Sequence, residues 1–123
     1  MYGFITIPSN LVFDLIQHPY VQRLRYIKQL GMTHLVYPGA LHTRFHHALG
    51  AMHLMGLAME TIKSKGQAIS FEEEQAVTIA ILLHDIGHGP FSHALEHTIV
   101  KGISHEDISM MLMNELISPL KEN

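Results

Sequence analysis

The segment 84–93, which reads HDIGHGPFSH, constrains this chain more than any other. It begins with an adjacent His-Asp pair at the end of the apolar run 76–83, and two more histidines follow closely. A buried helix that ends in imidazole and carboxylate groups is costly unless a partner satisfies them. Imidazole nitrogen and carboxylate oxygen are ordinary ligands of divalent metal ions. The segment therefore predicts a metal site at the end of a buried helix.

The amino-acid composition is that of one folded domain with an excess of histidine, which favours a metal site. Histidine accounts for 11 of the 123 residues, compared with 8 for lysine and arginine together. The length fits one domain, and 47% apolar with 15% charged residues excludes a disordered chain. The formal net charge of -3 gives no electrostatic reason to expect nucleic acid as a partner.

Features that would indicate secretion or membrane attachment are absent from the sequence. The chain has no cysteine, so it has no disulfide and no thiolate metal site, which is compatible with a reducing compartment. Its first residues, MYGFITI, lack the basic start and cleavage site of a signal peptide. No apolar stretch approaches the roughly 20 residues that span a bilayer. We therefore expect a cytoplasmic protein with no membrane partner.

Capping residues and helix breakers recur along the chain and predict an all-α fold after a β-like start at residues 2–7. The predicted helices span residues 8–17, 19–30, 43–65, 70–85, 92–100 and 104–118. The helix over 43–65 is apolar on nearly all sides, which is typical of a central, buried helix. A capping box at 70–73 opens the other buried helix.

Four stretches contribute polar side chains to a candidate site: 44–47, 84–85, 88–93 and 96–105. The first stretch opens the central helix, and the second ends the other buried helix. If these helices pack together, His47 meets His84 and Asp85 around one ion. Two imidazoles and a carboxylate with open positions are typical of a catalytic metal rather than a structural one.

The histidines allow two other interpretations, a zinc peptidase motif and ordinary side chains without a shared site. His84 and His88 have the i, i+4 spacing of the zinc peptidase motif H-E-x-x-H, but Asp85 replaces the glutamate. Gly87 and Pro90 also interrupt the helix that would bring both imidazoles to one face, so a peptidase is disfavoured. Isolated histidines usually satisfy a neighbour or face solvent, and we assign that ordinary role to His18, His34, His42, His53 and His97.

The motifs, taken in order, resemble a known family. They are Arg44-Phe45-x-His47, then His84-Asp85-x-Gly87-His88-Gly89-Pro90-Phe91-Ser92-His93, then His105-Glu106. This ordered set is similar to the HD-domain superfamily, and within it to the deoxynucleoside triphosphate triphosphohydrolases. The likeness extends through 22–31 and 37–40 and covers most of residues 1–117. The resemblance implies an all-α HD-domain helical bundle.

The resemblance also implies binding roles. It implies that the metal ligands are His47, His84 and Asp85. Arg44 would hold a substrate phosphate, for which a guanidinium is well shaped. Gln29 and Leu30 would line the sugar end of the pocket. The metal would be one divalent ion, for which Fe, Mn, Mg, Zn and Ni all suit such ligands.

Four further residues receive catalytic roles from the resemblance. His88, Glu96 and His105 would form an orienting and proton-handling set, with Glu96 standing where the family commonly has aspartate. His93 would approach the scissile phosphate, as the acid for the leaving oxygen.

Two aspartates of the family pattern have no counterpart in this sequence. The family's metal site is closed by a later aspartate, and neither Asp14 nor Asp107 falls in that place. We therefore expect residues 1–123 to be the N-terminal portion of an HD phosphohydrolase domain, inactive when taken alone. Gln17 stands where some relatives use an aspartate to bind an activating guanine nucleotide, so such activation is not expected from this position.

The resemblance predicts a metal-dependent phosphohydrolase that converts a deoxynucleoside triphosphate (dNTP), dGTP included, to nucleoside and triphosphate. We expect the protein to act as a homo-oligomer. One alternative is an HD phosphohydrolase or phosphodiesterase acting on a nucleoside monophosphate, a cyclic dinucleotide or an alarmone. Another is a non-catalytic helical module that binds nucleotide.

Overall fold

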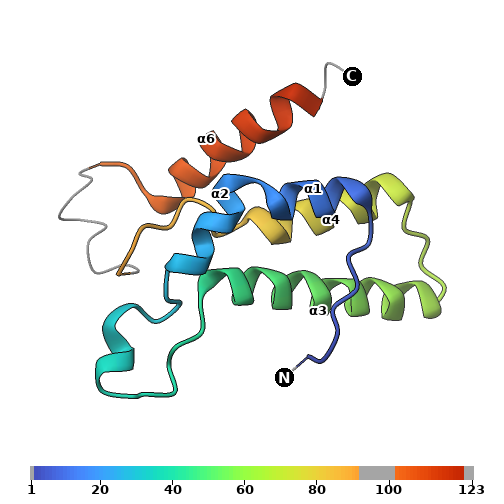
Figure 1. The fold of residues 1–123 in the computed structure, drawn as a ribbon. Helices are drawn as coiled ribbons and strands as arrows, with labels where there is room; N and C mark the ends of the chain where they lie inside the picture. The colour runs from blue at the N-terminus through green and yellow to red at the C-terminus, as the bar shows by residue number, and fades with distance from the viewer. Residues whose placement is uncertain (1, 92–101, 121–123) are drawn as a thin grey trace.

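The computed structural model describes residues 2–91 and 102–120, which form an all-α arrangement. The α-helices are α1 (Asn10–Gln17), α2 (Pro19–Gln22), α3 (Arg44–Ser64), α4 (Phe71–Leu83) and α6 (His105–Ile117). Short 3-10 helices are η1 (Arg23–Tyr26), η2 (Gly31–Leu35) and η4 (Ser118–Leu120). Figure 1 shows α3 and α4 packed together and running in opposite directions, with α6 on the far side of α4 from α3.

Local capping explains where the long helices begin. Thr43, Ser70 and Ser104 each cap a helix, and each forms a reciprocal pair with the side chain three residues later. The predicted starts of α3, α4 and α6 are therefore confirmed. Pro19 occupies the first turn of α2, as predicted from its fixed backbone angle. The predicted helix over 92–100 lies outside the described residues.

The core is continuous across these elements. Its buried apolar side chains include Val12, Leu15, Ile16, Val21, Leu24, Phe45, Ala48, Met52, Leu82, Leu83, Ile86 and Leu116. Burying one such side chain fully contributes roughly 1.5–3 kcal/mol. Leu83 and Ile86 are completely buried on either side of the His84–Asp85 pair. The pair is thereby held at the edge of the core.

Two predictions for the first 30 residues are wrong. Residues 2–7 form no strand, and the helix predicted over 19–30 gives way to 3-10 geometry and ends at Tyr26. At Ile27 the backbone becomes extended, because residues 27–29 find partners across the fold. The Gln29 amide donates to the His42 carbonyl at 3.0 Å, and the Arg44 amide donates to the Ile27 carbonyl at 2.8 Å. This pairing anchors the start of α3 beside η1.

The expectation that the central helix is buried on all sides is also wrong for the described part of the chain. One side of α3 is buried, yet Leu54 and Leu57 on another side are 50% and 47% exposed. The reason is that α4 covers one side of α3, while no described element covers these two leucines. No helix within 2–91 or 102–120 has both the length and the apolar character needed to cross a membrane.

Candidate metal centre

Three side chains that are distant in sequence converge where the start of α3 meets the end of α4. They are His47 in the first turn of α3, His84 at the C-cap of α4 and Asp85 in the turn that follows. Each offers one ligand atom, and these three atoms lie within 4.8 Å of one another. Among the residues that the structure describes, this is the only group of three or more histidine or acidic side chains with that geometry. The antiparallel packing of α3 and α4 is what brings the three together.

The hydrogen bond on the far side of the His84 ring prepares its other nitrogen for a metal. His84 Nδ1 lies 2.6 Å from the carbonyl oxygen of Ile81. A carbonyl only accepts, so Nδ1 carries a proton, and in the neutral tautomer this leaves the Nε2 lone pair for a metal. That nitrogen faces His47 Nε2 at 3.2 Å and lies 3.5 Å from Asp85 Oδ1. A divalent cation fits this donor set, because it would satisfy lone pairs that otherwise face one another.

Asp85 remains ionised at the centre of the cluster. Burial raises the pKa of its carboxyl, but the hydrogen bond from His88 and the charges of His84 and Arg44 outweigh burial and hold the pKa well below its usual range. The nearest donor is Arg44 Nη1, 2.8 Å from Asp85 Oδ2. Burial lowers the pKa of His47, which favours the neutral imidazole that binds metals.

Arg44, predicted to hold a substrate phosphate, lies directly against the metal ligands. Its side chain is buried and paired with the Asp85 carboxylate. The planar guanidinium is also well shaped to hold a phosphate oxygen. The phosphate role of Arg44 stays a prediction.

Two members of the proposed proton-handling set, His88 and His105, lie together in the structure. His88 is buried, and its Nε2 lies 3.4 Å from Asp85 Oδ1. Its ring stacks on that of His105 with centroids 4.0 Å apart and 26° between the planes. His93 and Glu96 lie outside the described residues, and their roles stay predictions.

The two residues predicted to line the sugar end of the pocket lie just before η2. The amide oxygen of Gln29 is buried and finds no hydrogen-bond partner within the described ranges. A buried acceptor without a partner costs free energy, so it is a natural contact for a ligand that donates a hydrogen bond. Leu30 is about half exposed.

Gly87 allows α6 to approach the turn that carries His84 and Asp85. A Cβ atom at this position would lie 2.3 Å from the His105 carbonyl oxygen and 2.4 Å from the Ser109 amide nitrogen. Both are backbone atoms, so neither can rotate away. The lack of a side chain at Gly87 is therefore what permits the first turn of α6, and with it the His105 ring, to reach His88.

We expect Gly87→Ala to destabilise the fold by about 1–3 kcal/mol or more, because the new methyl group forces α6 away from the turn. The free energy of unfolding in urea measures this loss. Gly56→Ala is the matched control, since a Cβ at Gly56, inside α3, meets nothing within 4 Å. The control should be neutral or slightly stabilising. Equal unfolding free energies for the two variants would contradict the assigned packing.

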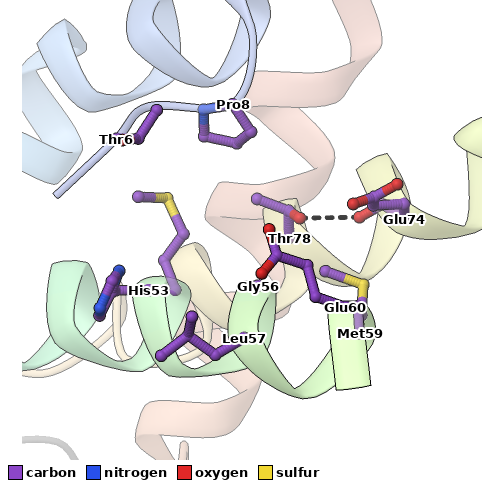
Figure 2. Close-up of a pocket in the computed structure, with 10 residues that line it drawn as sticks. Thr6, Pro8, His53, Gly56, Leu57, Met59, Glu60, Glu74 and Thr78 are labelled. Carbon is purple, nitrogen blue, oxygen red and sulfur yellow. Dashed lines mark hydrogen bonds between the residues drawn. The ribbon is translucent and has the colours of Figure 1, made fainter. Parts of the chain in front are cut away.

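A separate hollow of about 260 Å³ lies between the N-terminal segment, α3 and α4. Figure 2 shows Thr6 and Pro8 on one side of it and His53, Leu57 and Glu60 of α3 on the other. Thr78 of α4 also lines it, with its hydroxyl bonded to the Glu74 carbonyl. None of the lining residues belongs to the metal-ligand cluster, so the hollow is not the candidate site.

Two residues that contact the site were missed by the sequence analysis. The Arg23 guanidinium and the Ser109 hydroxyl both bond to the backbone of the turn at 84–88. Contacts to backbone leave no spacing signal in a sequence, and neither residue lies next to a metal ligand in the chain. Only the position of Gly87 between two histidines hinted at a close approach.

Comparison with known proteins finds a family model and relatives that match most of the chain. Residues 44–122 match the family model described as HD domain. The deoxynucleoside triphosphate triphosphohydrolase SAMHD1 homolog of Dictyostelium discoideum is 40% identical over 124 residues, which are 95% of this chain and 24% of the relative. The deoxynucleoside triphosphate triphosphohydrolase SAMHD1 of Homo sapiens is 40% identical over 126 residues, which are 96% of this chain and 20% of the relative. The chain thus spans between a fifth and a quarter of the length of these curated relatives.

Two solved structures resemble the fold described above. The crystal structure of a phosphohydrolase from Bacteroides thetaiotaomicron superposes with a TM-score of 0.93 at 56% sequence identity, over 97% of this chain and 30% of that one. A hypothetical protein from Aquifex aeolicus superposes with a TM-score of 0.80 at 40% identity, over 99% of this chain and 31% of that one.

Proposed function

Since this chain belongs to the HD domain family, we propose that it is the N-terminal portion of a phosphohydrolase domain that converts dNTPs, dGTP among them, to nucleoside and triphosphate. The observation that carries the proposal is the convergence of His47, His84 and Asp85 at the junction of α3 and α4. The substrate class is supported by relatives that are named as dNTP triphosphohydrolases. On its own, the 123-residue chain is proposed to be inactive.

His47, His84 and Asp85 would hold the divalent ion, for which Fe, Mn, Mg, Zn and Ni are all candidates. When bound, such an ion neutralises phosphate charge and lowers the pKa of a coordinated water. The ionised Asp85 carboxylate provides the negative charge of the site, and the Ile81 carbonyl holds the His84 tautomer whose Nε2 lone pair would bind the ion.

The other side chains would bind the substrate and move protons. Arg44 stabilises charge on the phosphate oxygens from its buried position beside Asp85. His88 gives or takes a proton, with His105 stacked against its ring. His93 supplies the proton of the leaving oxygen, and Glu96 assists in orienting His88. Gln29 offers its unpartnered amide oxygen to the sugar end of the nucleotide.

The products of the reaction test this proposal. The full-length protein, incubated with each dNTP and with several divalent metals in turn, should release nucleoside and inorganic triphosphate. Attack at the phosphate nearest the sugar leaves the three phosphates joined. Chromatography separates triphosphate from shorter products. Release of orthophosphate or pyrophosphate instead would contradict the proposal and move the protein to another branch of the family, such as one acting on nucleoside monophosphates or cyclic dinucleotides.

We also propose that the full-length protein is a cytoplasmic homo-oligomer. Consecutive apolar side chains at Leu35, Val36 and Tyr37, where η2 ends, are largely exposed, which supports association with another surface. The lack of cysteine in the chain is compatible with a reducing cytoplasm.

A further inference from the structure

The five residues 84–88 form a turn rather than a continuation of α4, although they carry two metal ligands and His88. Two backbone hydrogen bonds fold this stretch: the Ile86 amide donates to the carbonyl of Leu83, the last residue of α4, and the His88 amide donates to the Asp85 carbonyl, both at 3.1 Å. A helix C-terminus leaves carbonyl groups without partners, and buried backbone groups need partners. The remaining polar groups of the turn must therefore be satisfied from outside.

Ser109 satisfies two of these groups from α6. Its hydroxyl accepts a hydrogen bond from the Gly87 amide at 2.9 Å and donates to the His84 carbonyl at 3.4 Å. A serine hydroxyl has one donor and two acceptor positions, so both contacts are compatible. The Ser109 side chain is buried, and the absence of a side chain at Gly87 allows this close contact.

Arg23 satisfies two more groups from η1. Its guanidinium donates through Nη1 to the His88 carbonyl at 2.9 Å and through Nη2 to the Ile86 carbonyl at 2.5 Å. The two N–H groups form a planar fork that matches two carbonyls held at a fixed separation. Arg23 therefore holds the carbonyls of Ile86 and His88, while Ser109 holds the His84 carbonyl and the Gly87 amide.

We propose that Arg23 and Ser109 are positioning residues that hold the backbone of residues 84–88 and thereby set the separation of the metal ligands. The inference rests on the metal site of the proposed function. A metal or catalytic site works only when its ligands are held within about 0.5 Å of the productive geometry. Neither residue touches the ligand atoms of His84 or Asp85, so both act through the backbone that carries them.

Binding of Co²⁺ to the full-length apoprotein tests the proposal without reference to turnover. Ser109→Ala removes the contacts to the Gly87 amide and the His84 carbonyl, and Arg23→Lys keeps the charge but loses the fork. We expect either change to weaken Co²⁺ binding by roughly 10–100-fold, the usual effect of losing a residue that orients a ligand. The visible absorption of the Co²⁺-saturated variants should also differ from that of the wild type, because the ligand geometry changes.

Matched variants separate positioning from general destabilisation. Ser64→Ala removes a hydroxyl that donates to the Thr61 carbonyl at the end of α3. Arg25→Lys changes a guanidinium that contacts Gln22 and the Phe45 ring. Both controls should bind Co²⁺ as the wild type does. The free energy of unfolding of each apoprotein is measured alongside, so that a variant which fails to fold is recognised and replaced by its partner variant.

Three results would overturn the proposal. The first is wild-type Co²⁺ affinity in both Ser109→Ala and Arg23→Lys. The second is weaker affinity with an unchanged absorption spectrum at saturation, because the ligands would then have kept their geometry. The third is a wild-type protein that binds no Co²⁺. A wild type that binds Co²⁺ at this site but hydrolyses no dNTP would overturn the proposed function only.

Discussion

Replacing His84 by alanine is expected to abolish stoichiometric metal in the full-length protein and, with it, any hydrolysis that depends on the metal. His84 Nε2 lies within 3.5 Å of both other ligand groups, and its ring is fixed by the Ile81 carbonyl. The alanine variant keeps the helix end but leaves His47 and Asp85 as the remaining members of the ligand cluster described here. Elemental analysis of the purified protein measures the metal content per chain.

The matched control for this prediction is His42→Ala. His42 is exposed and lies near the start of α3, but it is not part of the ligand cluster. The control variant should keep its metal. Full metal retention in His84→Ala would decide against the assigned ligand set, whatever happened to activity.

Replacing His88 by alanine should leave the metal content near normal but lower turnover roughly 10²–10⁴-fold, which is the usual contribution of a positioned acid or base. His88 follows His84 by four residues, yet α4 ends at Leu83, so the two rings do not share a helix face. The His88 ring stacks on His105 and is not one of the three clustered ligands. Metal content and kcat, measured on the same preparation, separate the two effects.

His105→Ala should change turnover in the same direction as His88→Ala, but by a smaller factor. His105 contacts the His88 ring rather than the ligand cluster, so its loss should reproduce the pattern of His88→Ala more mildly. Loss of metal in His88→Ala would make His88 a ligand and end this division of roles. Unchanged turnover in His88→Ala would show that His88 only packs in the core and handles no proton.

The convergence of His47, His84 and Asp85 was predictable because local signals determine where the helices carrying them begin and end. Capping residues Thr43 and Ser70 begin α3 and α4, and both helices are apolar enough to pack against each other. Two antiparallel neighbours joined by a short connection must place the start of one beside the end of the other. The ligand positions follow from that arrangement alone.

Features that depend on contacts between distant backbone segments were not predictable in the same way. The chain leaves helical geometry after Tyr26 because residues 27–29 bond to 42–44, and no local propensity records that pairing. Arg23 and Ser109 bond to carbonyl and amide groups that every residue possesses, so their partners cannot be inferred from residue types. The exposed Leu54 and Leu57 of α3 are as apolar as its buried Phe45 and Met52, so the sequence alone does not separate them.

The antiparallel packing of α3 and α4 also has an electrostatic consequence. Peptide dipoles give a helix a partial positive charge at its N-terminus and a partial negative charge at its C-terminus, each worth about 0.3–1 kcal/mol to a suitable ion. The contact between His47 and His84 joins the positive end of α3 to the negative end of α4. A cation is favoured beside α4 and a phosphate beside α3. The backbone thereby gives the junction opposite polarity on its two sides, independent of the side chains that line it.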